Sequence, residues 1–251
     1  DLCKLMAGGY GTLAVMTDLT VKVLPAAEAT RTVALDGLDA AQGVRALTRG
    51  QQSAYAVSGA AYLPADIAAA CGIDDVARAD APTVLLRLEG PPKSVADRAE
   101  KLAGELADFG GARILDHAVS TALWQAIRDV KPFVGESGRA VWRLSVPPAE
   151  GAAVVAALAD AEPDARWFMD WGGGLIWALV PQGNDAQHKA VRRAVPASGG
   201  HATLIRADAE VRASVPVFQP QDAGVAALTK RIKDGFDPRR VLNPGRMYAG
   251  V

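Results

Sequence analysis

Two arginines stand inside otherwise apolar segments of the sequence. Arg87 lies in "LLRLEG" and Arg143 lies in "VWRLSV". A guanidinium is costly to bury without a partner, so each must face solvent, a protein carboxylate or a ligand. Guanidinium groups bind carboxylates in bidentate geometry. The two positions therefore predict either structural ion pairs or a site for a small carboxylate, with Arg143 the stronger candidate.

His201 is the candidate proton acceptor, because it follows two glycines at the start of an apolar segment. Imidazole titrates near neutral pH, which suits a general base, and the alternative is a hydrogen-bonded structural histidine. Arg206 lies five residues further on. In a regular strand an odd spacing places two side chains on opposite faces, so we expect no site that His201 and Arg206 share.

Aspartate and tryptophan surround three consecutive glycines in "DWGGGLIW", residues 170–177. One interpretation is a tight turn whose tryptophans, Trp171 and Trp177, cover a small sheet. The other is that Asp170 and Trp171 approach a ligand, since glycine permits close approach of the backbone. The histidines and cysteines show no ligand spacing, so we expect no protein-only metal site.

The composition limits the class of protein. Half of the 251 residues are hydrophobic, and 27 basic residues against 28 acidic ones leave a formal charge of −1. The sequence has no basic run, no apolar stretch of membrane-spanning length and no signal peptide, which argues against nucleic acid and membrane-spanning classes. We expect a soluble, cytoplasmic protein. Because the first residue is Asp1, we also expect a chain processed or cut from something longer.

Short apolar segments alternate with alanine-rich segments through most of the chain. Strand-like patterns lie at 31–37, 53–59, 83–90, 112–117, 138–147, 165–171, 175–181 and 199–208. Helical patterns lie at 39–50, 64–72, 91–111, 120–130, 148–161 and 184–195. The order strand, helix, strand, strand, helix, strand occurs twice, which is the ferredoxin-like arrangement.

The predicted fold class is therefore α+β, with two tandem ferredoxin-like βαββαβ units at 31–116 and 138–208. Their strands are expected to form one antiparallel sheet with helices on one face and the other face free. The two ends depart from this pattern. Residues 4–25 predict a glycine turn followed by a strand, and residues 225–251 predict a helix to about Asp234 followed by a proline-broken tail.

These two ends carry a family resemblance. Residues 1–25, "DLCKLMAGGYGTLAVMTDLTVKVLP", resemble the segment that closes the FAD-binding domain of vanillyl-alcohol-oxidase-type (PCMH-type) FAD-linked oxidases. Residues 235–248, "GFDPRRVLNPGRMY", resemble the carboxy-terminal signature of the same proteins. Within that superfamily the likeness is to FAD-binding subunits of bacterial glycolate oxidases, through "WRLSVP", "MDWGGGLIW" and "GGHATLIR".

The resemblance implies three segments arranged around a flavin. Residues 1–25 would close an FAD domain, residues 26–220 would form the cap or substrate domain, and residues 221–251 would return to the FAD domain. It implies cofactor contacts at Gly8, Gly9, Gly11, Thr12, Val15, Thr17 and Asn243, although Asn-Pro is also a common turn signal. The rest of the FAD domain would precede Asp1, so this chain alone is expected to retain no FAD.

The resemblance also implies a reaction and partners. The expected activity is flavin-dependent oxidation of a small 2-hydroxy acid, glycolate or D-lactate, with Arg143 and His201 as catalytic residues. Asp170, Trp171 and Arg87 would lie at the substrate or flavin edge. Implied partners are a larger FAD-linked oxidase subunit and an iron–sulfur subunit, which could bring the protein to the inner membrane as a peripheral component. The alternative is a stand-alone tandem ferredoxin-like module that binds a ligand or a protein without redox chemistry.

Overall fold

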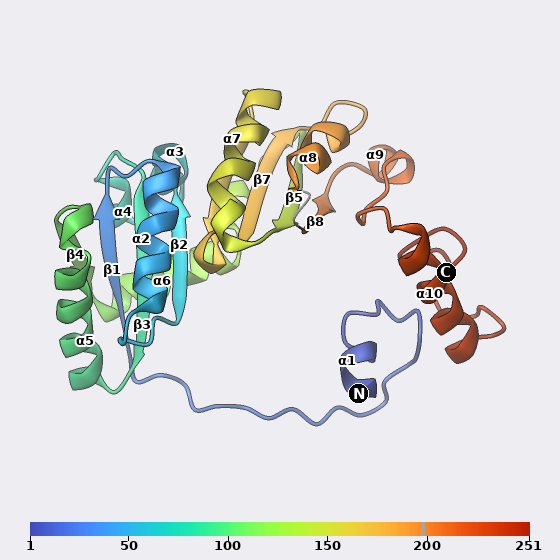
Figure 1. Cartoon of the computed structure of the whole chain (residues 1–251), viewed down its shortest axis with the longest axis horizontal. Coiled ribbons are helices and arrows are strands. Elements are labelled where there is room, and N and C mark those ends of the chain that lie inside the picture. Colours follow the sequence, from blue (N-terminus) through green and yellow to red (C-terminus); the bar gives the residue numbers. More distant parts are fainter. Residues whose placement is uncertain (197–198) are drawn as a thin grey trace.

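A single eight-stranded antiparallel sheet organises the computed structural model, which describes residues 1–196 and 199–251 (Figure 1). The strand order is β4-β1-β3-β2-β6-β7-β5-β8. The strands are β1 Ala29–Asp36, β2 Gly59–Leu63, β3 Thr83–Gly90, β4 Ala112–Leu115, β5 Arg139–Ser145, β6 Arg166–Asp170, β7 Leu175–Pro181 and β8 His201–Arg206. Every strand pair in the sheet is antiparallel.

The sheet consists of two halves with the same topology. In each half the fourth strand lies next to the first, followed by the third and the second. The halves meet where β2 pairs with β6 through Tyr62 and Met169. The predicted fold class is confirmed: two ferredoxin-like units share one antiparallel sheet.

Helices cover both faces of the sheet. On the first face the core includes Val33, Leu86 and Trp142, packed against α2 Ala40–Gln52, α5 Pro92–Glu105, α7 Gly151–Ala161 and α8 His188–Ala194. On the second face Leu85 and neighbouring strand residues pack against α3 Ala65–Ala70, α4 Asp74–Ala77 and α6 His117–Arg128. The expectation of helices on one face alone is wrong in this respect, because several strands are apolar at successive positions and bury both faces.

The amino-terminal segment differs most from its prediction. Residues 1–28 contain only the short helix α1 Leu2–Met6, and the strand predicted before Pro25 is an extended segment without a pairing strand. Leu19, Val21 and Val23 are exposed. Figure 1 shows this segment running below the sheet from α1, which lies beside α10 Ala223–Phe236. An alternating pattern specifies a strand only where a neighbour supplies the hydrogen bonds.

Most other elements lie close to their predicted positions. The strand predicted at 53–59 is found at β2 instead, since α2 extends to Gln52 and a turn follows it. Helix α8 begins at His188 rather than Asn184. Helices α1, α4 and α9 Ala209–Ser214 were not predicted, nor were the short 3-10 turns η1 Ala107–Phe109, η2 Lys131–Phe133, η3 Pro148–Glu150 and η4 Trp171–Gly173.

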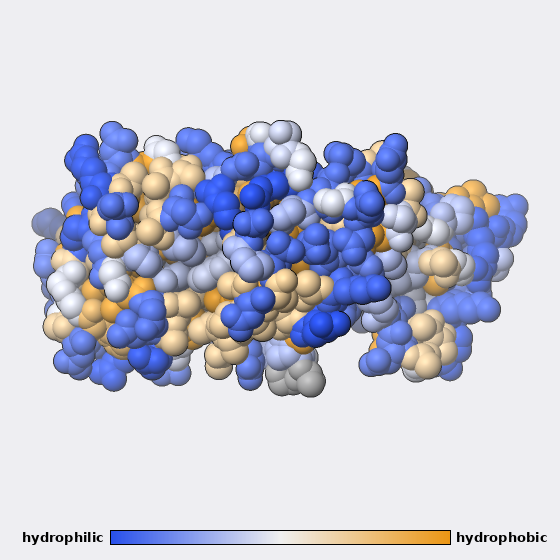
Figure 2. Space-filling view, turned by 90° about the horizontal axis from the view of Figure 1, so that it is seen from above, coloured by the Kyte–Doolittle hydropathy of each residue, from blue (hydrophilic) through white to orange (hydrophobic). Residues whose placement is uncertain are grey.

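Hydrophilic and hydrophobic residues alternate in small areas on the face seen in Figure 2. Within the described ranges, no helix has the length and hydropathy needed to cross a membrane.

Candidate active site

A cavity of about 700 Å³ opens on the second face of the sheet, where the two units meet. A row of residues on neighbouring strands lines it: Arg87 of β3, Gly59 of β2, Asp170 of β6, Trp177 of β7 and Arg143 of β5. Gly59 pairs with Arg87 and Trp177 pairs with Arg143, so these residues share one face. Helix α6 supplies one wall, with Thr121, Trp124, Gln125 and Arg128. We call this cavity the seam cleft.

Arg143 brings an uncompensated positive charge to the seam cleft. Its guanidinium carbon lies 5.0 Å from the ring centroid of Trp171, a cation–π contact. Over the described part of the chain, Arg143 makes no ion pair and its side chain makes no hydrogen bond. The structural ion pair that was the alternative interpretation is therefore not found among those residues. A half-buried guanidinium of this kind is suited to bind a carboxylate.

Arg87 is held differently. Its Nε lies 3.1 Å from Glu89 Oε2 and donates to Ser58 Oγ at 3.2 Å, and its Nη2 donates to the Ser58 carbonyl at 3.1 Å. The guanidinium stacks on Trp124 at 5.0 Å. A Cβ on Gly59 would lie 3.1 Å from both Arg87 Nε and the Trp124 ring, so glycine makes room for this stack. Arg87 thus enters the seam cleft with its charge already paired.

Asp170 ends β6 and faces the seam cleft. Its Oδ1 accepts a hydrogen bond from the Trp171 backbone N–H at 2.7 Å. Burial raises the pKa of Asp170, and the Trp171 hydrogen bond and the charge of Arg87 oppose that shift. A carboxyl group with a raised pKa, in the same cavity as a guanidinium that has no partner among the described residues, is typical of a site that exchanges a proton with its ligand.

The turn Trp171–Gly173 follows Asp170 and carries the indole that contacts Arg143. Trp171, Gly172 and Gly173 have φ of 52°, 66° and 101°, which is strained for tryptophan. A Cβ on Gly173 would lie 2.7 Å from the Pro148 carbonyl oxygen, and one on Gly172 would overlap the Gln51 side chain. Gly173 is thus required by close packing against the backbone and Gly172 by its positive φ, which agrees with the tight-turn interpretation. The indole of Trp171 remains 55% exposed and supports Arg143 rather than the core.

His201 and Arg206 do not meet the predicted pattern. The register of the β5–β8 pair shifts between Val141 and Trp142, where Ile205 of β8 is the extra residue, so that Val141 pairs with Arg206 while Ser145 pairs with His201. The pairing puts both side chains on the face of Arg143, so the expectation of opposite faces is wrong, because a β-bulge changes the alternation. They still share no site, since they lie at opposite ends of β8 and Arg206 donates to the Glu136 carbonyl. His201 is exposed and does not line the seam cleft.

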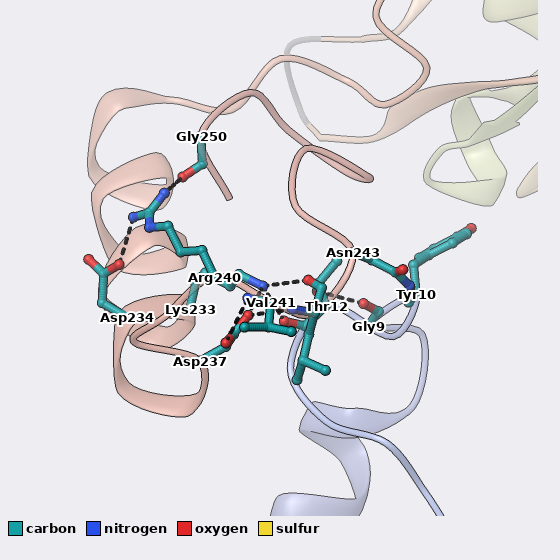
Figure 3. Close-up of polar contacts among 11 residues, drawn as sticks. Gly9, Tyr10, Thr12, Lys233, Asp234, Asp237, Arg240, Val241, Asn243 and Gly250 are labelled. Carbon is teal, nitrogen blue, oxygen red and sulfur yellow. Dashed lines mark hydrogen bonds and ion pairs between the residues drawn. The ribbon is translucent and has the colours of Figure 1, made fainter.

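The glycine-rich segment and the tail form a second cluster, which we call the terminal junction (Figure 3). The backbone N–H and Oγ1 of Thr12 both donate to the Gly9 carbonyl, at 2.9 and 2.6 Å. Asn243 Nδ2 donates to the Tyr10 carbonyl at 3.0 Å, and a Cβ on Gly11 would lie 2.8 Å from that nitrogen. Gly11 and Asn243 were both predicted as cofactor contacts, and in the structure the Asn243 side chain lies against Gly11.

The terminal junction depends on a lysine that the sequence analysis missed. Lys233 has no exposed surface, and its Nζ donates to the Thr12 carbonyl, the Leu242 carbonyl and Asp237 Oδ2 at 2.7, 2.6 and 2.8 Å. The hydrogen bond from Lys233 is the main cause that lowers the pKa of Asp237 to about 2. A lysine on the inner side of an amphipathic helix, four residues before an aspartate, was the available signal.

The remaining predicted cofactor residues lie apart from the contacts of the terminal junction. Gly8 has open space where a side chain would begin, and Val15 and Thr17 are exposed. Across residues 1–196 and 199–251, no group of three or more histidine, cysteine or acidic side chains could hold a metal ion.

The sequence of this chain is similar to that of known FAD-linked oxidases. The family model described as FAD linked oxidases, C-terminal domain, matches residues 219–247. Glycolate oxidase subunit GlcE of Escherichia coli (strain K12) is 29% identical over 253 residues, covering 99% of this chain and 57% of that protein. The predicted resemblance to FAD-linked oxidases is confirmed. Residues 235–247 of its carboxy-terminal signature lie within the family match, and its amino-terminal segment forms half of the terminal junction.

Solved structures show the same fold at low sequence identity. The structure of 4-ethylphenol oxidase from Gulosibacter chungangensis matches 90% of this chain and 55% of its own, with a TM-score of 0.59 and 14% identity. An alkyldihydroxyacetonephosphate synthase matches 97% of this chain and 49% of its own, with a TM-score of 0.57 and 16% identity. The chain therefore spans about half the length of the relatives it matches.

The described residues fit one part of a flavin–substrate assembly. The seam cleft, with an open indole beside an unpaired guanidinium, fits a planar ring edge and a small carboxylate. The glycine turn does not form a diphosphate cradle, because the Gly9 and Thr12 N–H groups bond within the turn and Asn243 lies against Gly11.

Proposed function

We propose that this protein is part of a flavin-dependent oxidoreductase that oxidises a small 2-hydroxy acid, glycolate or D-lactate, to the 2-oxo acid. The observation that carries the proposal is Arg143 in the seam cleft, which has no carboxylate partner within residues 1–196 and 199–251 and stacks on an exposed indole. The similarity to FAD-linked oxidases and to a glycolate oxidase subunit supports the oxidoreductase class and the cofactor.

The side chains of the seam cleft take the following roles. Arg143 binds the substrate carboxylate in bidentate geometry and so fixes the α-carbon over the sheet. When bound, FAD supplies the acceptor for the hydride of the α-carbon. Asp170 accepts the hydroxyl proton, because it faces the cleft as a carboxyl group whose pKa burial moves toward working pH. His201 was predicted for that role, but its position outside the cleft lining favours Asp170.

Residues 26–220 serve as the cap or substrate domain in this proposal, and residues 1–25 and 221–251 join it to an FAD-binding domain. The terminal junction supports this, because it brings the two family-like ends into contact. Gly8, Val15 and Thr17 keep their predicted place near the cofactor in the whole enzyme. The 251-residue chain alone would hold no flavin and would be inactive.

Partner subunits complete the proposed enzyme. A larger FAD-linked oxidase subunit and an iron–sulfur subunit would accept the electrons, and they would bring a cytoplasmic protein to the inner membrane. The name of the GlcE relative, a subunit, supports a multi-subunit assembly.

Visible spectroscopy tests the proposal. The full-length protein, purified with its partner subunits, should be yellow, and glycolate or D-lactate should bleach the flavin band without oxygen. A colourless preparation that binds no added FAD would contradict the proposal and favour the stand-alone binding module. Separately, stoichiometric FAD in the purified 251-residue chain would contradict the proposed inactivity of that chain.

A further inference from the structure

We propose that the seam cleft selects a 2-hydroxy acid with a single carboxylate, and that Glu89 determines this preference by occupying Arg87. The inference rests on the proposed function and specifies its substrate class. It contrasts two arginines that line the same cavity from β3 and β5.

The Arg87 end of the cleft is unfavourable for a second anion because Glu89 already balances the charge of Arg87. Glu89 Oε2 lies 3.1 Å from Arg87 Nε and accepts a 2.6 Å hydrogen bond from Ser58 Oγ. Arg87 and Glu89 side chains are 29% and 32% exposed, so the pair lies within the cleft wall rather than in open solvent. A ligand carboxylate would have to displace Glu89 from the Nε edge of Arg87, or approach the remaining Nη1 against the charge of Glu89.

The charges of the residues that line the seam cleft also favour a ligand with a single carboxylate. Glu89 balances the charge of Arg87, and Asp170 lies on β6, midway in the strand order between β3 of Arg87 and β5 of Arg143. Arg128 on the α6 wall is paired with Asp129. Arg143 alone of the cleft-lining arginines has no carboxylate partner among the described residues. A second carboxylate on the substrate would therefore meet like charge at the Arg87 end, which costs binding energy.

The test compares ligands with one and two carboxylates. Propionate and succinate lack the 2-hydroxyl group and cannot be oxidised, so tryptophan fluorescence of the full-length protein reports their binding alone. Trp124, Trp171 and Trp177 line the cleft and supply the signal. We expect propionate to bind at least about fivefold more tightly than succinate, and Glu89→Gln to reduce that ratio to about one.

Three controls make the result specific. Glu89→Asp keeps the charge and should keep the preference. Glu105→Gln removes the carboxylate from another arginine pair, Arg49–Glu105, outside the cleft and should leave both affinities unchanged. Thermal unfolding of each variant verifies that it is folded.

Two outcomes would overturn the inference. Equal affinity of the wild-type protein for propionate and succinate would show that the cleft does not discriminate by the number of carboxylates. An unchanged ratio in folded Glu89→Gln would show that Glu89 does not set it. A wild-type protein that responds to neither propionate nor glycolate contradicts the proposed function itself, and this inference with it.

Discussion

The charge of Arg143 is balanced differently from that of Arg113 and Arg166, two other arginines on the sheet. Arg113 pairs with Asp36, and Arg166 pairs with Asp66 and Glu136, whereas Arg143 has only an indole beneath it within the described chain. Structural arginines in half-buried strands are neutralised because desolvation of an unpaired charge is costly. Arg31, Arg139 and Arg206 also have no carboxylate partner among the described residues, but only Arg143 of these lines the seam cleft, and this position indicates a ligand site.

Replacing Arg143 by Met should weaken glycolate binding by about 10- to 100-fold, since a charge-assisted hydrogen-bonded pair contributes about 1.5–3 kcal/mol. Arg143→Lys should recover part of the loss, because it restores charge without the bidentate fork. Fluorescence titration measures the affinities. Arg139→Met on the same strand, whose side chain bonds the Asp164 carbonyl outside the cleft, is the control. Equal losses in Arg139→Met and Arg143→Met would remove the specific role of Arg143.

Asp170 gives a prediction for stability against pH. The pKa of Asp170 is raised in the folded protein. The contribution of Asp170 to the free energy of unfolding is therefore most favourable below the ordinary aspartate pKa, and it is lost as pH rises through the raised value. Asp170→Asn should therefore raise the unfolding midpoint at about pH 7–8, and less so in acid. Asp129→Asn removes a carboxylate whose pKa is lowered by Arg128, and it should not raise the unfolding midpoint at that pH. Midpoints measured across pH decide this, and an Asp170→Asn protein less stable at neutral pH would contradict the assigned environment.

At the scale of elements, the turn η4 carries Trp171, which contacts Arg143, and it packs against the start of helix α7. Gly151 begins α7, and a Cβ there would overlap the Gly173 carbonyl oxygen of that turn. Because φ at Gly151 is helical, the constraint is the close contact and not the backbone conformation.

Gly151→Ala should destabilise the fold by about 1–3 kcal/mol through this overlap and should also lower glycolate affinity. A Cβ added to Gly224, near the start of α10, would meet no atom within 4 Å, so Gly224→Ala is the matched control with an effect within about 0.5 kcal/mol. Denaturant unfolding measures both. Similar values for the two variants would contradict the tight packing of η4 against α7.

Element positions followed from the sequence where local signals agreed with tertiary contacts. The strand pattern at 83–90 coincides with β3, and the pattern at 175–181 coincides with β7. The part of residues 4–25 that follows the glycine turn was predicted as a strand because alternation records a preference but not the presence of a neighbouring strand. The place of α6 on the second face could not be predicted, since its apolar stripe fits either face of a sheet buried on both.

At the scale of the whole molecule, the terminal junction joins the amino-terminal turn to the carboxy-terminal helix and tail. Lys233 Nζ bonds the Thr12 carbonyl, and no other charged side chain within the described ranges is fully buried. Lys233→Met should release residues 1–28, because it removes three hydrogen bonds and leaves Asp237 without its lysine partner.

Limited proteolysis of residues 13–28 measures this release. Cleavage should be faster in Lys233→Met than in Lys230→Met, whose lysine lies on the same helix and makes no contact in the terminal junction. Because the pKa of Asp237 is lowered to about 2, the wild-type junction should persist above the ordinary aspartate pKa and weaken as pH falls from about 4 towards 2. Equal cleavage of both variants would contradict the role of Lys233.

The candidate site was only partly predictable. Arg87, Arg143, Asp170 and Trp171 were selected as separate residues, and the structure brings them to one cavity because β2 and β6 pair across the two units. No local signal specifies that pairing. Glu89 and Trp124, which hold Arg87, were missed, although Glu89 lies two residues after Arg87 on the same strand face. The spacing of His201 and Arg206 in the sequence does not reveal the bulge that lies between them in β8.

The central claim is that the seam cleft binds a 2-hydroxy acid by its carboxylate. The most direct measurement is a crystal structure of the full-length protein with glycolate, prepared without oxygen. The account predicts both carboxylate oxygens within about 3 Å of the Arg143 guanidinium, with the 2-hydroxyl group toward Asp170. Glycolate bound elsewhere, such as the cavity of about 1010 Å³ beside Tyr10, Phe218 and Tyr248, with Arg143 left unliganded, would contradict it.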